Sequence, residues 1–244
     1  MVVWLEDSES PFPPVSKALK TPNGLLAAGG DLSPERLLTA YKQGIFPWFN
    51  PGEPILWWSP NPRCVIHPKE LHISRSLRKT LKRTQYKVTF NQAFTDVIKA
   101  CSAPRADQQG TWISQEMIAA YTLLHQQGIA HSVEVWREDQ LVGGLYGLAL
   151  GSLFFGESMF SRTTDASKIA FSFLCVQLNE WEFKLIDCQV HNPHLESLGA
   201  TLISREDFCA MLSQYGEAPN TLNWEFSINK DSVLHFATEA GNES

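Results

Sequence analysis

The chain has 244 residues, of which 43% are hydrophobic and 19% charged, a composition that excludes an intrinsically disordered protein. Its formal net charge of −6 argues against a protein that coats nucleic acid over its whole surface. The five cysteines are scattered without a CxxC pair, which argues against a disulfide framework and against a zinc knuckle.

The sequence predicts a soluble protein of a reducing compartment, the cytoplasm. No signal peptide is predicted, because Glu6 and Asp7 interrupt the start of the chain before any apolar segment. The longest apolar run, residues 145–155, is shorter than the ~20 residues of a membrane helix and contains Gly147 and Gly151.

The first part of the chain is rich in Pro, Gly and Trp, and Pro60 and Pro62 end it. We interpret residues 1–62 as a small N-terminal domain and residues 63–244 as the main domain. Residues 44–63 contain five prolines and five large aromatic residues without periodicity, so we expect buried rings rather than strand pairing to hold them.

Two helices are predicted early in the chain. Ser33 is placed as the N-cap of the first, Pro34 as its first residue, and Gly44 as its end. The second, over residues 72–83, places apolar side chains on one face and basic side chains on the other. Its basic residues belong to a cluster of seven that contrasts with the acidic remainder of the chain and suggests a local polyanion site: Lys69, Arg75, Arg78, Lys79, Lys82, Arg83 and Lys87.

Apolar periodicity then predicts an alternation of strands and helices. We expect a strand over residues 86–91, with Asn91 as N-cap of a helix over 93–102, and a helix over 114–128 capped by Ser114. The segments that follow are a hairpin over 131–150, a strand over 151–160, a helix over 161–181, a strand over 184–190, a helix over 204–215 and a polar tail after Glu217 that is frayed at its end.

An antiparallel meander followed by a helix and a further strand is the core of GNAT-type acyltransferases. The fold class is therefore α/β (α+β): a small N-terminal domain plus a GNAT-like acyltransferase domain whose central, mostly antiparallel sheet is flanked by helices. The phosphate-binding loop of an acyl-CoA enzyme is missing, because residues 161–167 read SRTTDAS. A GNAT-like fold is therefore predicted here without predicting acyl-CoA as the cofactor.

Three polar residues interrupt apolar strands. Glu157 lies in residues 151–160, and Asp187 and Gln189 lie in residues 184–190. Because strand side chains alternate, Asp187 and Gln189 are expected on the same side of the sheet, with Cys188 on the opposite side as a core residue. Burying a carboxylate and an amide without partners costs free energy. The two residues therefore form either a hydrogen-bonded structural pair or part of a catalytic site.

Several motifs together resemble the leucyl/phenylalanyl-tRNA–protein transferase family, from about Phe12 to Leu212. They include PNGLLAAGGDLSPERLLTAYKQGIFPWF, ILWWSPNPR, LHISRSL, LVGGLYG, FFGESMFSR and LIDCQV. The resemblance implies transfer of Leu or Phe, with Met as a third candidate, from aminoacyl-tRNA to the N-terminal Arg or Lys of proteins. It also implies that an N-degron adaptor reads the product, that no metal or diffusible cofactor takes part, and that the enzyme is a monomer.

The resemblance assigns roles to individual residues. Asp187 and Gln189 match the catalytic aspartate and the glutamine it holds; which of the two acts more directly stays open. Glu157 matches the glutamate that contacts the aminoacyl α-ammonium. The positions that match the aminoacyl pocket are Leu145, Phe154, Met159, Leu174 and Ile186. For Phe154 and Met159 to share one side of a strand, a bulge near Gly156 is required.

Further positions match the tRNA-binding residues of the family. The aromatic residues that receive the 3′ adenosine are Tyr41, Trp48, Trp112 and Tyr121. The helix that meets the acceptor-stem phosphates carries Arg75, Lys79, Lys82 and Arg83. Trp57 and Trp58 are interpreted as structural anchors, and His191 and His194 lack a third ligand for zinc.

Three other functions remain as alternatives. A related transferase that accepts acidic N-termini would need a different acceptor pocket. A GNAT acetyltransferase would need the missing acyl-CoA loop, and a non-catalytic RNA-binding module would not need the buried acid and amide pair.

Overall fold

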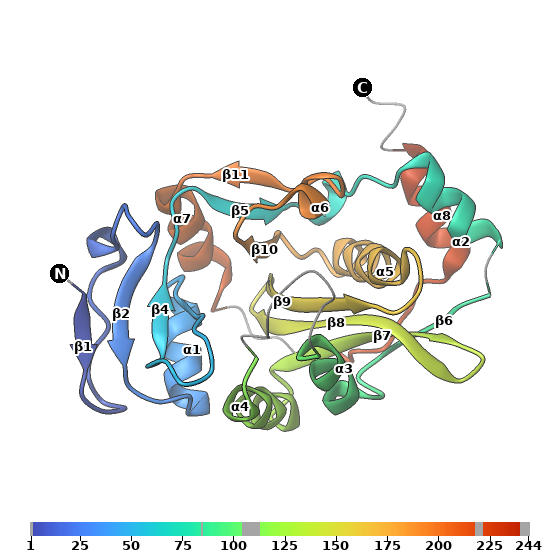
Figure 1. Ribbon diagram of the computed structural model, residues 1–244. Coiled ribbons are helices and arrows are strands. Elements are labelled where there is room, and N and C mark those ends of the chain that lie inside the picture. The colour runs from blue at the N-terminus through green and yellow to red at the C-terminus, as the bar shows by residue number, and fades with distance from the viewer. Residues whose placement is uncertain (1, 84, 104–112, 218–221, 240–244) are drawn as a thin grey trace.

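The computed structural model describes residues 2–83, 85–103, 113–217 and 222–239 (Figure 1). It is an α/β protein with two sheets. The smaller sheet has four strands, in the order β1 (Val3–Leu5), β2 (Leu25–Gly29), β4 (Leu56–Trp58) and β3 (Phe46–Pro47). The larger sheet has seven strands, in the order β11 (Thr201–Ile203), β5 (Arg63–Ile66), β10 (Leu185–Gln189), β9 (Leu153–Ser161), β8 (Gln140–Leu150), β7 (Ala130–Arg137) and β6 (Lys87–Phe90).

The seven-stranded sheet is mostly antiparallel, as predicted, and its one parallel pair among the described strands joins β9 to β10. The hairpin β7–β8, the strand β9, the following helix and β10 have the order expected of a GNAT-like sheet (Figure 1). The hairpin turn is a two-residue connection in which Glu138 and Asp139 both have positive φ.

The helices cover both faces of the larger sheet (Figure 1). One face packs against α3 (Phe94–Cys101) and α4 (Gln115–Gln126), and the other against α5 (Ala166–Glu180). The remaining helical segments are η1 (Val15–Lys17), α1 (Pro34–Lys42), η2 (Pro68–Glu70), α2 (Arg75–Arg83), α6 (Pro193–Glu196), α7 (Arg205–Tyr215) and α8 (Lys230–Glu239). No helix within the described residues is both long and apolar enough to cross a bilayer.

Most predicted helix starts are confirmed. Ser33 caps α1 by accepting from the backbone N–H of Arg36 (3.3 Å), and Ser114 caps α4 by accepting from that of Met117 (3.2 Å). The N-cap predicted at Asn91 is wrong, since Ala93 is the N-cap of α3. Asn91 instead accepts from the backbone N–H of Ser132 (3.0 Å) and so fastens the end of β6 to β7.

One further prediction is corrected by long-range packing. Residues 44–63 do contain paired strands, because β3 and β4 join the small sheet, although Trp57 is fully buried as the predicted anchor. The end of the tail, where fraying is predicted, lies outside the described residues, whereas residues 222–239 are packed against the domain. The helix α8 packs on α5 through the buried Val233, and the Trp224 ring stacks on His131 at 3.5 Å.

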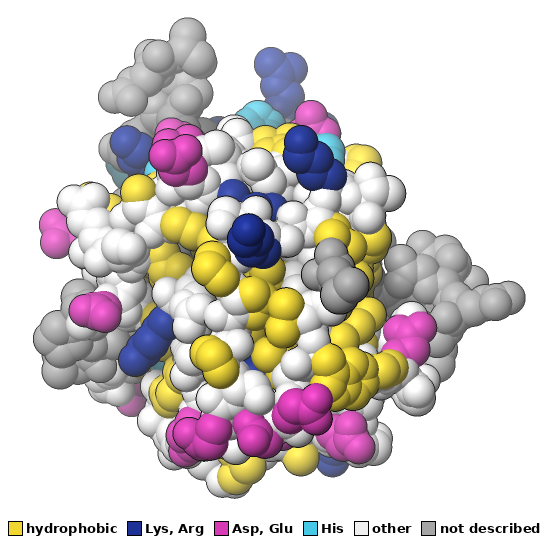
Figure 2. Space-filling model, turned by 90° about the vertical axis from the view of Figure 1, so that its left-hand side faces the viewer, with side chains coloured by type: hydrophobic (Ala, Val, Ile, Leu, Met, Phe, Trp, Pro, Cys, Tyr) yellow, Lys and Arg dark blue, Asp and Glu magenta, His cyan; other side chains and the backbone are white. Residues whose placement is uncertain are grey.

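Charge is unevenly distributed over the surface. Figure 2 shows the side of the molecule that lies at the left of Figure 1, where acidic side chains gather along the lower edge and basic side chains stand apart from one another. The basic helix α2 lies at the other end of the molecule, beside α8 (Figure 1). The exposed basic face predicted for α2 is therefore separated from this acidic edge.

Candidate active site

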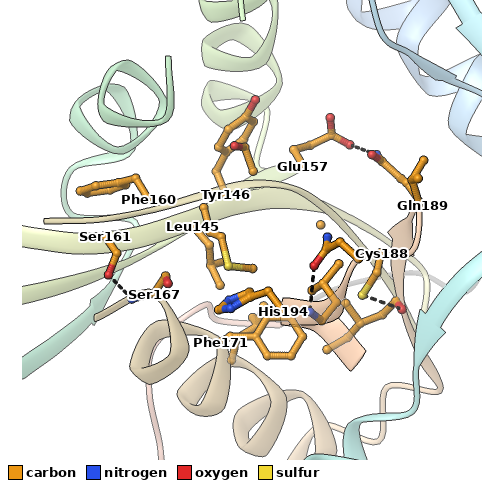
Figure 3. Close-up of a pocket in the computed structure, with 18 of the residues that line it drawn as sticks. Leu145, Tyr146, Glu157, Phe160, Ser161, Ser167, Phe171, Cys188, Gln189 and His194 are labelled. Carbon is orange, nitrogen blue, oxygen red and sulfur yellow. Dashed lines mark hydrogen bonds between the residues drawn. The ribbon is translucent and has the colours of Figure 1, made fainter. Parts of the chain in front are cut away.

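A cleft of about 940 Å³ opens beside β8, β9 and β10, and we call it the cleft (Figure 3). The first half of α5, the helix α6 and Trp48 contribute to its wall. All five side chains predicted for an aminoacyl pocket line it, namely Leu145, Phe154, Met159, Leu174 and Ile186. Its polar side carries Glu157 and Gln189. The cleft therefore joins an apolar wall to a carboxylate and an amide.

The bulge expected near Gly156 is present in β9. Tyr146 pairs with Ser158 and Gly147 pairs with Gly156, so that Glu157 is an extra residue with no partner on β8. The extra residue reverses the alternation, and Phe154 and Met159 therefore contact the same apolar cluster. A one-residue insertion thus builds the apolar wall and places Glu157 at its edge.

Glu157 is held by three donors from three different elements. Its Oε1 accepts from the Tyr41 hydroxyl at 2.7 Å and from Gln189 Nε2 at 2.8 Å, and its Oε2 accepts from the Tyr121 hydroxyl at 3.0 Å. Burial raises the pKa of Glu157 from 4.5 to about 7, against the opposing effect of these three hydrogen bonds. The carboxyl group therefore changes charge near neutral pH.

A second bulge shapes β10. Asp187 pairs with Val65 and Gln189 pairs with Cys64, so Cys188 is the extra residue, and Gln189 has a φ of 61°. The predicted alternation therefore fails here. Cys188 and Gln189 both line the cleft, and Cys188 is not confined to the opposite side as predicted (Figure 3).

Asp187 lies behind the wall of the cleft and is 1% exposed. Its two carboxylate oxygens accept from Arg63 Nε at 2.8 Å and Arg63 Nη2 at 2.6 Å, a bidentate pair. The backbone N–H of Gln189 also donates to Asp187 Oδ1 at 2.9 Å. Asp187 therefore reaches the cleft through Gln189 and not through its own oxygens.

Arg63 is the residue that the sequence analysis missed. Its Nη1 donates to the Gly44 carbonyl at 3.2 Å, and its guanidinium lies 4.8 Å from the Phe46 ring centre and 4.6 Å from that of Phe208. The signal that could have found it is the predicted burial of Asp187, because a buried carboxylate requires a cation or several donors. Sequence alone does not say which of the arginines supplies it.

The aromatic residues predicted for adenosine binding separate into groups. Trp48 lines the cleft, is 43% exposed and lies 5.5 Å from the Trp58 ring, so its indole presents a free face. Tyr41 and Tyr121 are fully buried, and their rings offer no face for a base to stack on. In this structure the two tyrosines hold Glu157 through their hydroxyls, and their assignment to the 3′ adenosine stays a prediction. Trp112 lies outside the described residues.

The basic helix α2 presents its predicted cations to solvent. Its Leu77 and Leu81 are buried, while the four basic residues assigned to phosphate contacts are exposed: Arg75, Lys79, Lys82 and Arg83. The helix is tied to the start of α5, because the Thr80 hydroxyl donates to Asp165 Oδ2 at 2.9 Å.

The remaining candidate ligands do not form a metal site. His191 and His194 line the cleft, and His191 Nε2 lies 3.4 Å from Glu196 Oε2. Within the part of the chain that the structure describes, no three His, Cys, Asp or Glu side chains are grouped to hold a metal ion.

Comparisons with known proteins agree with the motifs. The family model described as "Leucyl/phenylalanyl-tRNA protein transferase" matches residues 65–213, and the model of its N-terminal domain matches residues 30–61. The chain is 60% identical over 226 residues to the leucyl/phenylalanyl-tRNA–protein transferase of Cellvibrio japonicus (strain Ueda107), covering 92% of this chain and 96% of that protein. It is 62% identical over 222 residues to that of Nitrosomonas europaea, covering 91% and 94%.

Among solved structures, a ribosomal-protein-alanine N-acetyltransferase from Brucella melitensis biovar Abortus 2308 is similar over 60% of this chain and 99% of its own, with 13% identity and a TM-score of 0.33. With a TM-score this low, the comparison does not contribute to the assignment of the family. The two family models and the high identity over nearly the full length of the relatives decide the assignment. This chain belongs to the leucyl/phenylalanyl-tRNA–protein transferase family.

Proposed function

We propose that this protein transfers Leu or Phe, with Met as a third candidate, from aminoacyl-tRNA to the N-terminal Arg or Lys of acceptor proteins. The observation that carries the proposal is the meeting of Glu157 and Gln189 at the edge of the apolar cleft. An apolar side chain that is unbranched at Cβ fits the apolar wall, and the α-ammonium of the amino acid requires a carboxylate beside that wall. Family membership supports the same reaction.

The reaction needs orientation and charge stabilisation more than it needs a strong base. The acceptor's neutral amine forms a C–N bond to the ester carbonyl, the ester C–O bond breaks, and one amine proton ends on the 3′ oxygen of the tRNA. The aminoacyl ester already holds the energy of the new bond, so the proposal invokes no metal and no cofactor. Positioned donors and the developing oxyanion then govern the rate.

Glu157 is proposed to fix the donor. Its buried carboxylate accepts from Tyr41 and Tyr121 on one side and lines the cleft on the other. An α-ammonium in the cleft would favour the ionised form of Glu157 and so lower its raised pKa. Binding of the donor and ionisation of Glu157 are therefore coupled.

Gln189 and Asp187 are proposed to have different roles toward the acceptor amine. Gln189 faces the cleft and orients the reacting groups with its amide. Asp187 supports it from behind, since Asp187 is paired with Arg63 and accepts the Gln189 backbone N–H. Electrostatic support of proton loss from the amine, rather than direct acceptance of that proton, agrees with the burial of Asp187.

The tRNA is proposed to lie across Trp48 and α2. The exposed Trp48 indole at the cleft would stack on the 3′ adenosine. The cations of α2 would contact acceptor-stem phosphates, which are common to tRNAs of different sequence. The amino acid in the cleft would then decide which charged tRNA is used.

The remaining parts of the proposal concern the context of the reaction. We infer that an N-degron adaptor reads the new N-terminal Leu or Phe, that the enzyme is a cytoplasmic monomer, and that residues 1–62 and 63–244 are its two domains. An acetyl-CoA reaction is disfavoured at the start of α5. There Asp165 contacts Thr80 and Lys168 and would place a carboxylate against a pyrophosphate.

The test is transfer of radiolabelled Leu from charged tRNA to peptides that begin with Arg, Asp or Ala. We expect label on the Arg peptide alone, and its loss in Gln189→Ala. The matched control is Gln126→Ala, an exposed glutamine at the end of α4, which should transfer normally. Label on the Asp peptide would favour a related transferase that accepts acidic N-termini. No transfer by a protein that still binds charged tRNA would favour a non-catalytic RNA-binding module.

A further inference from the structure

Two cysteines that the proposed reaction does not use lie against each other at the cleft. Cys64 is on β5 and is fully buried, whereas Cys188 is on β10, is partly exposed and lines the cleft. Both side chains belong to one apolar cluster, each thiol shifts the pKa of the other, and both thiols are free. Figure 3 shows Cys188 beside Gln189, with its thiol directed to the Ile186 carbonyl at 3.9 Å.

The strand pairing brings the two cysteines close to disulfide range. Cys64 pairs with Gln189, and Cys188 is the extra residue of the bulge next to that pair. In a bulge two residues of one strand oppose a single residue of the other, so Cys188 and Gln189 both lie opposite Cys64. Directly opposite residues of antiparallel strands have Cα atoms roughly 4.5–5.5 Å apart. A disulfide requires about 4.4–6.8 Å between Cα atoms, so the register places the two cysteines close to that range.

We propose that Cys64 and Cys188 form a reversible disulfide when a peroxide enters the cleft, and that this bond switches off aminoacyl transfer. The loss of transfer rests on the function proposed above, whereas formation of the bond does not. The two consequences are therefore tested by separate measurements.

The chemistry balances with hydrogen peroxide as the oxidant. The peroxide first meets Cys188, the member of the pair that lines the cleft, and oxidises its sulfur to a sulfenic acid with release of one water. The Cys64 sulfur then attacks the oxidised sulfur, and hydroxide leaves as the second water. Two thiols and one peroxide thus give one disulfide and two waters. A small dithiol reverses the bond by exchange.

The protonation of the pair makes this a slow modification. The Cys64 thiol and burial raise the pKa of Cys188 well above its usual value, while the Cys188 thiol lowers the pKa of Cys64. The cleft-facing sulfur is therefore mostly a thiol, and the thiolate is the reactive form. Cys64 is the better attacking group in the second step, as a resolving cysteine must be.

The bond would act on the active site through the bulge. Bringing the two sulfurs to a covalent distance of about 2.05 Å must draw Cys188 toward β5. Cys188 is joined directly to Asp187 and Gln189, and the bulge between them sets the position of the Gln189 amide against Glu157. A displacement of about 1 Å at such a group costs roughly 100-fold in rate.

The test treats the full-length protein with hydrogen peroxide and follows mass, disulfide mapping and transfer. We expect the loss of two hydrogen atoms, a peptide pair linked through Cys64 and Cys188, and a fall in transfer of roughly 100-fold that dithiothreitol restores. In Cys64→Ala, untreated transfer should be normal, and the dithiothreitol-reversible loss should be absent. The matched control is Cys175→Ala, a fully buried cysteine on α5, which should keep both the linked peptide and the reversible loss.

Three outcomes would overturn the proposal. They are an unchanged mass after peroxide treatment, a linkage that uses Cys175 in place of Cys64, and a linked protein that transfers as fast as the reduced one. If Cys64→Ala does not fold, mapping of the unmutated protein still decides whether the bond forms. A protein without any transfer activity would contradict the proposed function, but the mass and mapping results would still stand.

Discussion

Replacing Glu157 with glutamine should make the protein more stable at high pH and inactive at every pH. Burial raises the pKa of Glu157 from 4.5 to about 7, which corresponds to about 3 kcal/mol in favour of the protonated form. Between these pH values the folded state binds the proton more tightly than the unfolded state. The free energy of unfolding of the unmutated protein therefore falls as the pH rises from 4.5 to 7.

The glutamine amide can satisfy the same partners without a charge. Its oxygen would accept from Tyr41 and Gln189, and its nitrogen would donate to Tyr121, whose hydroxyl can accept as well as donate. Glu157→Gln should therefore exceed the unmutated protein by up to about 3 kcal/mol above pH 7. The difference should vanish below pH 4.5, where the Glu157 carboxyl of the unmutated protein is protonated in both the folded and the unfolded state.

The assay is urea unfolding across this pH range, beside aminoacyl transfer. The matched control is Glu134→Gln, a fully buried carboxylate outside the cleft. In that variant the NH2 group of the new glutamine must face the backbone N–H of Gln92 or Ala93, which cannot accept a hydrogen bond. The gain in the free energy of unfolding should therefore be smaller than for Glu157→Gln by about 1–3 kcal/mol. Aminoacyl transfer should persist. A Glu157→Gln protein whose stability follows the same pH dependence as the unmutated one would refute the reasoning.

Three further predictions concern other parts of the site. Arg63→Met leaves the Asp187 carboxylate buried without a cation and should lower the free energy of unfolding by about 3–5 kcal/mol, so an unchanged urea midpoint would contradict the pairing. Trp48→Ala should weaken binding of aminoacyl-tRNA by about 1–3 kcal/mol through lost stacking, seen as a higher KM. A fall in kcat alone would argue against stacking. Lys79→Glu combined with Lys82→Glu should reduce the slope of log affinity against log salt by about 2, and an unaltered slope would remove α2 from the tRNA interface.

The sequence by itself determined most of the secondary structure and the identity of the cleft residues. Apolar runs and periodicity located α2, the meander β7–β8–β9, α5 and β10, because these patterns and the turn residues between them are local signals. Ser33 and Ser114 marked helix starts, because a capping side chain acts within three residues of itself. The need for a bulge in β9 followed from the family resemblance, because the match to the aminoacyl pocket required Phe154 and Met159 to share one side.

Only the tertiary structure decided how the polar groups are partnered. The cation on Asp187 comes from Arg63, 124 residues away along the chain, and the hydroxyls on Glu157 come from Tyr41 and Tyr121, 116 and 36 residues away. Local patterns do not specify such partners, because any buried donor that the fold brings near would serve.

The bulge in β10 had the same origin. A strand pattern predicts strict alternation, whereas one extra residue held by pairing with β5 turned Cys188 and Gln189 to the cleft and left Asp187 behind the wall. Periodicity reports which side chains are apolar. The register of hydrogen bonds between strands decides where a polar side chain points, and that register depends on a neighbour distant in sequence.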